Sequence, residues 1–303
     1  MSTAPIICES PVIAEAPIAR TRRSDILELI RPRMNMLVLG TTMVGCCMAA
    51  QVPADWLRLP FTLIGTALCA ASASILNQLF ERRYDGLMVR TANRPLPTGR
   101  IAPAHALAMG LIAAFSGITI LWLLVNHLTA LLGGFTLISY VLLYTPLKRR
   151  TTLNTVVGAI PGAIPPVMGW TAITGSVAPP ALALFAILFI WQIPHFLAIA
   201  VLYREDYRKG GFRMLPVVDA TGRMTGRQIL FYAAALIPAT LAPVILHIAG
   251  PIYLASALLL GLGLMYFAAK AALGRTRLDA RRLFLASIIY LPILLTMLML
   301  DRT

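Results

Sequence analysis

The chain has 303 residues, of which 58% are hydrophobic and only 13% are charged, and its mean hydropathy is +0.79. Ordinary globular domains are about 45–50% apolar and about 25% charged, so this composition excludes a water-soluble fold, a disordered chain and a small disulfide scaffold. The 26 Lys and Arg residues against 12 Asp and Glu give a net charge of +14. No basic segment resembles a nucleic-acid-binding module, so we expect no nucleic acid partner. The composition predicts a protein embedded in a lipid bilayer.

Nine apolar segments are long enough to cross a bilayer, which takes about 20 residues in a helix. We place them at residues 34–51, 60–80, 104–125, 127–147, 153–174, 181–203, 229–249, 251–270 and 282–300. Residues 1–24 are polar and rich in proline, and we expect a disordered cytoplasmic tail there, ahead of a single transmembrane domain over residues 25–303. The predicted fold class is an all-α polytopic membrane protein with nine transmembrane helices.

The basic residues are concentrated on one side of the predicted membrane. All of them except Arg58 and Arg302 lie before the first span or at the connections that follow spans two, four, six and eight. Cytoplasmic loops carry an excess of Lys and Arg. We therefore expect a cytoplasmic N-terminus, a periplasmic C-terminus and, in a bacterium, a multi-pass protein of the inner membrane.

A polar stripe ends the second span. Asn77, Glu81 and Asp85 are spaced by four residues, which places them on one face of a helix. An amide and two carboxylates supply hard oxygen ligands of the kind that bind Mg²⁺ together with phosphate oxygens. The stripe therefore predicts a magnesium site. The alternative is a solvated helix end whose acidic side chains pair with neighbouring arginines.

Two basic segments are candidates for binding phosphate. The loop after the second span contains Arg90 and Arg94, and the connection after the fourth span contains Lys148 and Arg149. Guanidinium groups bind phosphate with two parallel hydrogen bonds. Combined with the acidic stripe, these segments indicate a diphosphate bridged by a metal. The alternative is that the charges only set the orientation of the chain in the membrane.

The end of the sixth span carries a second acidic pair. Glu205 and Asp206 lie at the predicted depth of Asp85, and we assign them to a second metal, with Lys209 beside them for the diphosphate. An ordinary charged loop is the alternative. His195 is the only titratable side chain well inside a span, which indicates a functional group.

If the helix were continuous, His195 would lie about 16 Å above Asp206, at a depth suited to an apolar acceptor. A histidine whose hydrogen bonds are satisfied by a neighbouring helix is the alternative.

Together, these segments resemble the UbiA superfamily of intramembrane prenyltransferases over about residues 30–300. The stripe matches the superfamily's Asn-x-x-x-Asp-x-x-x-Asp, with Glu81 in place of the first aspartate, and residues 90–96 match its Arg-Thr-x-x-Arg-Pro-Leu. The run at residues 191–196, Trp-Gln-Ile-Pro-His-Phe, resembles the branch of the superfamily that farnesylates protohaem IX. The superfamily's second Asp-x-x-x-Asp is absent, because Gly210 stands four residues after Asp206.

This resemblance implies transfer of a farnesyl group from farnesyl diphosphate to the 2-vinyl group of haem b, with addition of water and with Mg²⁺ as cofactor, for terminal oxidase biogenesis. It implies catalytic roles for Asn77, Glu81, Asp85, Asp206 and His195, with His195, Trp191 and Gln192 on the haem side. Association with haem A synthase or with terminal oxidase assembly is a further expectation. The alternatives are a UbiA-type enzyme with another aromatic or tetrapyrrole acceptor, a transporter, and a non-catalytic assembly factor.

Overall fold

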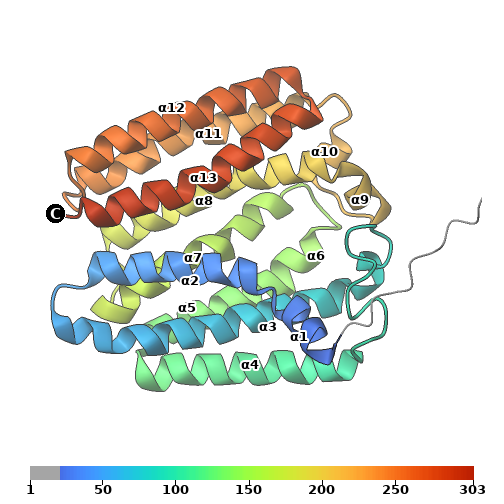
Figure 1. Cartoon of the computed structure of the whole chain (residues 1–303), viewed down its shortest axis with the longest axis horizontal. Coiled ribbons are helices and arrows are strands. Elements are labelled where there is room, and N and C mark those ends of the chain that lie inside the picture. Colours follow the sequence, from blue (N-terminus) through green and yellow to red (C-terminus); the bar gives the residue numbers. More distant parts are fainter. Residues whose placement is uncertain (1–20) are drawn as a thin grey trace, which may run out of the picture.

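The computed structural model describes residues 21–303, which form helices and connections without any strand. The long helices are α2 (Pro32–Ala49), α3 (Leu59–Asp85), α4 (Pro103–Leu124), α5 (His127–Ile138), α7 (Asn154–Thr174), α8 (Pro179–Leu202), α11 (Arg223–Ile245), α12 (Pro251–Gly274) and α13 (Arg277–Leu300). The short ones are α1 (Arg22–Ile30), η1 (Pro53–Arg58), η2 (Ser139–Tyr144), α6 (Thr145–Leu147), α9 (Arg204–Lys209) and α10 (Leu215–Val218). Figure 1 shows the long helices side by side in a bundle whose connections gather at two ends.

Eight helical segments of the described chain are long and apolar enough to cross a membrane, and they match the second to ninth predicted spans. They are Pro53–Asp85, Pro103–Leu124, His127–Leu147, Asn154–Thr174, Pro179–Leu202, Arg223–Ile245, Pro251–Gly274 and Arg277–Leu300. Helix α2 occupies the place of the predicted first span, but it is not among the eight, and its first turn contains Pro32, Arg33 and Asn35. The all-helical membrane fold is confirmed, whereas the count of nine spans stays a prediction.

The tail predicted over residues 1–24 lies mostly outside the described residues, which begin at position 21. Its end is wrong by three residues, because α1 already begins at Arg22. The Thr21 side chain caps this helix by accepting a hydrogen bond from the Ser24 backbone N–H at 3.3 Å. Asp25, buried in the first turn of α1, pairs with Arg100 at 2.9 Å and ties α1 to the loop after α3.

Helix α7 forms the centre of the bundle. It packs against α2 and α8, and more of its residues are buried than in the other candidate spans of the described chain. At Gly169 a Cβ atom would collide with the backbone oxygen of Thr42, and at Gly45 of α2 it would collide with that of Pro166. Small residues allow this close approach of two helix backbones. The glycines therefore decide how closely α2 and α7 pack.

The substitution Gly169→Ala is expected to destabilise the bundle by about 1–3 kcal/mol, because the added methyl group must displace the backbone of α2. Thermal unfolding of the purified protein in detergent measures this effect. Gly40→Ala, on α2, is the matched control, because a Cβ atom there meets no heavy atom within 4 Å. Equal melting temperatures for the two variants would contradict the close contact between α2 and α7.

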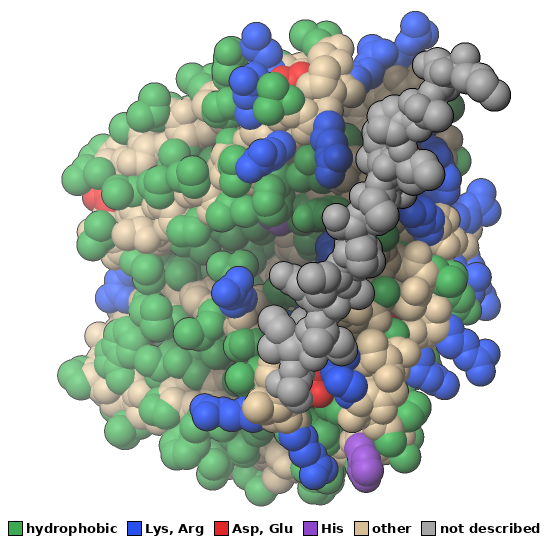
Figure 2. Space-filling view, turned by 45° about the vertical axis from the view of Figure 1, so that its right-hand side comes forward, with side chains coloured by type: hydrophobic (Ala, Val, Ile, Leu, Met, Phe, Trp, Pro, Cys, Tyr) green, Lys and Arg blue, Asp and Glu red, His purple; other side chains and the backbone are tan. Residues whose placement is uncertain are grey.

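The two ends of the bundle differ in charge. Arg302, near the C-terminus, donates to the backbone oxygen of Ala50 at 2.9 Å, and Arg58 donates to that of Ala172 at 3.4 Å. The loops after α3, α6 and α8 lie at the opposite end of the bundle (Figure 1). Figure 2 shows most of the visible Lys and Arg side chains gathered toward that end, with hydrophobic side chains over the flank. The charge separation predicted from the sequence is therefore present in space.

Candidate active site

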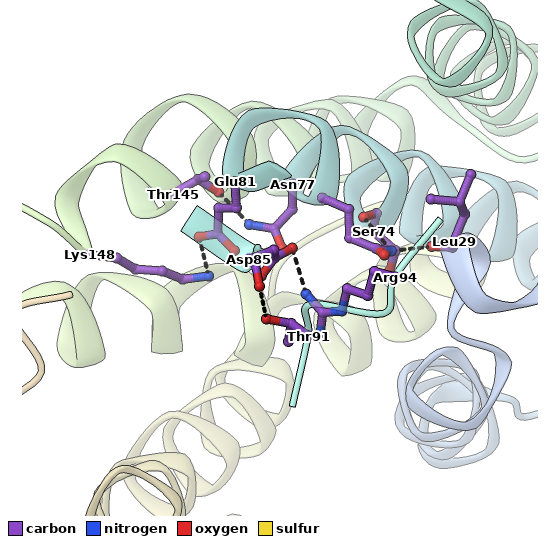
Figure 3. A network of polar contacts seen from close by, with 10 residues as sticks. Leu29, Ser74, Asn77, Glu81, Asp85, Thr91, Arg94, Thr145 and Lys148 are labelled. Atoms are coloured by element: carbon purple, nitrogen blue, oxygen red, sulfur yellow. Dashed lines mark hydrogen bonds and ion pairs between the residues drawn. The ribbon is translucent and has the colours of Figure 1, made fainter. Parts of the chain in front are cut away.

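The last turns of α3 carry the polar stripe into the protein rather than into solvent. The exposed fractions of Asn77, Glu81 and Asp85 are only 1%, 6% and 1%. Figure 3 shows the three side chains close together on one side of α3. A solvated helix end would leave the carboxylates exposed, so that alternative is wrong for this stripe.

Each carboxylate of the stripe is paired with a cation from another segment. Nζ of Lys148 lies 2.8 Å from Oε1 of Glu81, and a guanidinium nitrogen of Arg94 lies 2.8 Å from Oδ2 of Asp85. Figure 3 shows the two cations approaching the stripe from opposite sides. The structure therefore brings together the helix end and both predicted basic segments. Each of these charges needs an oppositely charged partner, because an isolated charge would be costly to bury.

Two buried oxygen atoms of the stripe have no hydrogen-bond partner among the described residues: Oδ1 of Asn77 and Oδ1 of Asp85. The Asn77 amide nitrogen donates to Oγ1 of Thr145 at 3.0 Å, which orients the carbonyl oxygen of the same amide. Buried polar atoms without a partner are rare and unfavourable. Mg²⁺ prefers oxygen ligands of this kind, and the two oxygen atoms have no other partner. Asn77 and Asp85 therefore fit a magnesium site.

Lys148 is largely, but not fully, buried, with 12% of its side chain exposed. Burial alone would lower the pKa of its ammonium group, but the Glu81 carboxylate and the nearby Tyr144 and Tyr140 hydroxyls raise that pKa above its usual value. The ammonium nitrogen lies 4.5 Å from the centre of the Tyr144 ring, at a distance where a cation is attracted by the aromatic face. Lys148 is therefore a fixed positive charge directed at the stripe.

Two further predicted cations are exposed and stacked on tyrosines. The Arg149 guanidinium lies 3.8 Å from the ring centre of Tyr84, the residue before Asp85, and it also hydrogen-bonds the Tyr84 hydroxyl. The Arg90 guanidinium lies 5.0 Å from the ring centre of Tyr203, at the end of α8. Arg149 is thereby held beside the stripe, while Arg90 connects the loop after α3 to the region of α9.

The predicted second acidic site differs from the expectation. The helix assumed to continue from His195 to Asp206 is interrupted at Tyr203, whose backbone leaves the α-helical conformation, and α9 is a separate short helix. Glu205 is exposed and pairs with Arg208 at 2.9 Å. Asp206 is partly exposed, and its carboxylate makes no hydrogen bond or ion pair with the described residues. A second metal at this pair stays a prediction.

Lys209 is exposed at the end of α9, and no ion pair joins it to another described residue. The segment that carries it nevertheless packs against the loop after α3. An apolar cluster joins the two segments and consists of Met88, Ala200, Phe212 and Met214, with Tyr84, Tyr207 and Val217 around it. Gly210 permits this packing, because a Cβ atom there would lie 2.9 Å from the Phe212 ring. The stripe and α9 are thus parts of one end of the molecule.

His195 packs against α13 inside the bundle. Its Nδ1 lies 2.8 Å from Oγ of Ser287, and its ring stacks on Trp191 with the ring centres 4.9 Å apart. The Trp191 indole N–H donates to the Ser287 backbone oxygen at 3.0 Å. The interhelical partner that the alternative interpretation of His195 requires is therefore present, but this contact satisfies only one of the two ring nitrogens.

Gln192 points toward a different helix. Its amide nitrogen donates to the Leu188 backbone oxygen at 3.0 Å, and its side chain lies against Gly162 of α7, where a Cβ atom would collide with it. Gly158 and Gly162 of α7 have the Gly-x-x-x-Gly spacing of a helix-packing motif. At Gly162 the missing side chain makes room for the polar side chain of Gln192. Of the three residues predicted on the haem side, His195 and Trp191 face α13, and Gln192 faces α7.

Three residues that contact the site were missed by sequence reasoning. Thr145 accepts the amide of Asn77, Tyr84 holds Arg149, and Ser287 contacts His195. Ser287 is one of few polar residues in the last span, which is the only signal that pointed to it. Thr145 and Tyr84 carry no such signal, because each lies among other polar residues.

A bundle of apolar helices that buries hard oxygen ligands beside fixed cations at one end defines an enzyme of the intramembrane prenyltransferase class, which handles a diphosphate at the edge of an apolar interior. The model of the UbiA prenyltransferase family matches residues 38–289. The chain belongs to this family and is a membrane prenyltransferase. Membership contradicts the alternatives of a transporter and a non-catalytic assembly factor.

The sequence relatives agree on one activity. A protein from Solibacter usitatus (strain Ellin6076) named protoheme IX farnesyltransferase is 47% identical over 287 residues, covering 92% of this chain and 98% of that protein. A protein of the same name from Myxococcus xanthus (strain DK1622) is 44% identical, covering 95% of this chain and 98% of that protein. The resemblance to the haem-farnesylating branch is therefore confirmed over nearly the whole chain.

Solved structures share the fold at low sequence identity. The structure of digeranylgeranylglyceryl phosphate synthase superposes with a TM-score of 0.78 at 18% identity, covering 92% of this chain and 98% of that one. A UbiA homologue from Archaeoglobus fulgidus, solved with DMAPP and Mg²⁺ bound, superposes with a TM-score of 0.64 at 17% identity, covering 91% of this chain and 99% of that one. At these identities the likeness shows the fold alone.

Proposed function

We propose that this chain transfers the farnesyl group of farnesyl diphosphate to the 2-vinyl group of haem b, with addition of water, and that Mg²⁺ is its cofactor. The observation that carries the proposal is the buried stripe, in which Asn77 and Asp85 each hold an unpartnered oxygen beside the cations Lys148 and Arg94. The acceptor is supported by the relatives, which are named for protohaem IX.

In the structure, Glu81 pairs with Lys148 and Asp85 pairs with Arg94. Asn77, Glu81 and Asp85 would hold Mg²⁺, which when bound neutralises diphosphate charge. Lys148 and Arg94 are the cations nearest to these ligands, and we assign them to the phosphate oxygens, with Arg149 at the more exposed edge. With the carboxylates on the metal and the cations on the phosphate oxygens, every buried charge would have a partner, which the low dielectric of the interior demands.

Arg90, Lys209, Glu205 and Asp206 are assigned to the outer part of the same site. The cation–aromatic contact between Arg90 and Tyr203 and the apolar cluster around Phe212 support this placement, because they join α9 to the loop after α3. Binding of a second metal by Glu205 and Asp206 belongs to this part of the proposal.

The reaction forms a carbon–carbon bond and a carbon–oxygen bond, and it breaks the C1–oxygen bond of farnesyl diphosphate, the vinyl π bond and one O–H bond of water. The bond between C1 of the farnesyl group and the diphosphate oxygen breaks, and its electron pair stays on the diphosphate, whose charge Lys148 and Arg94 stabilise. The vinyl π pair of haem forms the new carbon–carbon bond to C1. Water then adds to the resulting cation on the porphyrin side and loses a proton. The apolar helices keep other water away from the cation.

Removal of divalent metal provides the test of this proposal. Membranes that contain the protein, supplied with haem b, farnesyl diphosphate and Mg²⁺, are expected to yield a more hydrophobic haem whose mass has increased by one farnesyl group and one hydroxyl group. Excess chelator is expected to abolish this product, and added Mg²⁺ to restore it. A product formed equally well in chelator would contradict a metal site, and a prenylated quinone precursor in place of haem would contradict the acceptor.

The membrane topology belongs to the same proposal, together with an inner-membrane location in a bacterium. We expect a reporter that is active only outside the cytoplasm to be active when it is fused after Thr303, and inactive when it is fused into the loops after α3, α6, α8 or α12. The reason is the excess of basic residues in those loops. An inactive reporter at the C-terminus would contradict the nine-span arrangement. Association with haem A synthase or with oxidase assembly is a further part of the proposal.

A further inference from the structure

The hydroxyl group of Ser287 is placed to decide which nitrogen of His195 carries the ring proton. Oγ of Ser287 is fully buried, lies 2.7 Å from the backbone oxygen of Phe284, and lies 2.8 Å from Nδ1 of His195. A hydroxyl group has one proton. Both contacts are hydrogen bonds only when Ser287 donates to the carbonyl oxygen and the Nδ1–H of His195 donates to Ser287.

The surroundings of the ring favour this arrangement. The His195 ring contacts the rings of Trp191 and Phe284, with ring centres at 4.9 Å and 5.2 Å, so the surroundings of Nδ1 are largely apolar. In apolar surroundings the arrangement that makes two hydrogen bonds is preferred to one that makes a single bond. The Trp191 indole also donates to the Ser287 backbone oxygen, which holds this turn of α13 against α8. The Ser287 hydroxyl and the Trp191 ring therefore both contact the imidazole, and the two residues are themselves joined to each other.

We propose that Ser287 is a positioning residue that keeps His195 in the neutral tautomer with the proton on Nδ1, and that the free Nε2 lone pair is directed at the iron of the haem substrate. No hydrogen bond from a described residue reaches Nε2. Histidines that bind metal usually donate their other ring N–H to a fixed acceptor, which sets the tautomer and raises the basicity of the ligating nitrogen. The inference rests on the proposed function, in which His195 faces the haem.

The test is the variant Ser287→Ala, which removes the acceptor of Nδ1 without adding bulk. Its affinity for haem is expected to fall about tenfold, the effect usual for losing the partner of a metal-bound histidine. The KM for haem should rise accordingly while the KM for farnesyl diphosphate stays unchanged, and the absorption spectrum of bound haem should shift toward that of His195→Ala. Ser256→Ala is the matched control, because Ser256 also donates to a helix carbonyl, that of Ile252, but contacts no histidine.

The outcomes separate this inference from the function on which it rests. Unchanged haem affinity and spectrum in Ser287→Ala, together with their loss in His195→Ala, would overturn the role of Ser287 and leave the proposed function standing. A rise in both KM values would show a general packing role and would also overturn the inference. Normal haem binding in His195→Ala would overturn the inference together with the assignment of His195 to the haem, while haem farnesylation itself would still be measured by its product.

Discussion

The substitution Asp85→Asn is expected to lower kcat about a hundredfold to a thousandfold while the protein still folds and inserts. The change keeps the shape of the side chain but removes the negative charge from a buried group whose second oxygen has no partner among the described residues. It therefore removes a proposed metal ligand and leaves Arg94 without its counter-ion. Turnover of haem and farnesyl diphosphate in purified membranes, divided by the amount of folded protein, measures the effect.

Asp25→Asn is the matched control for this experiment. Asp25 is also a buried carboxylate, 4% exposed, and it also pairs with an arginine, Arg100 at 2.9 Å, but it joins α1 to a loop and does not belong to the stripe. We expect its activity per folded molecule to stay within about twofold of the parent protein, because exchange of a buried pair outside the site acts on stability. Similar losses in both variants would show that the Asp85 pair is structural.

His195→Ala is expected to lose haem farnesylation while the affinity for farnesyl diphosphate is retained. The imidazole is part of an aromatic stack on α8, where it contacts Trp191 and the hydroxyl of Ser287 on α13, and no cation or carboxylate of the stripe touches it. His195→Gln keeps hydrogen-bonding ability but binds iron poorly. Activity in the glutamine variant would therefore indicate that His195 orients the haem, and loss would indicate that it binds iron or takes up a proton.

The control for the histidine experiment is His127→Ala. His127 also packs on a tryptophan, Trp122, with ring centres 4.2 Å apart, but it lies at the start of α5. We expect this variant to bind haem and farnesyl diphosphate as the parent protein does. If His195→Ala turned over normally, His195 would be a packing residue like His127, and the assignment to the haem side would be wrong.

Features that depend on nearby residues could be predicted from the sequence. Mean hydropathy and segment length placed eight candidate spans correctly, because a membrane helix must satisfy its backbone internally and face apolar surroundings along its whole length. The four-residue spacing of Asn77, Glu81 and Asp85 placed them on one face of α3. This prediction is also local, because helical periodicity depends only on position along the chain. The ends of helices were less predictable. Helix α1, capped by Thr21, begins within the predicted tail, and Tyr203 separates α8 from α9 where one continuous helix was assumed.

What the tertiary structure decided is which groups meet. Lys148 and Glu81 are 67 positions apart and His195 and Ser287 are 92 positions apart, so no local pattern relates them. The hydropathy pattern shows that Glu81 lies at a helix end, but only the packing of α3 against the other helices shows that it is buried and must be paired. The sequence therefore determined the helices, the charged end and the polar stripe. The packing of helices distant in the sequence decided the ion pairs, the free oxygens and the orientation of His195, because burial makes an unpaired polar group costly and so selects its partners.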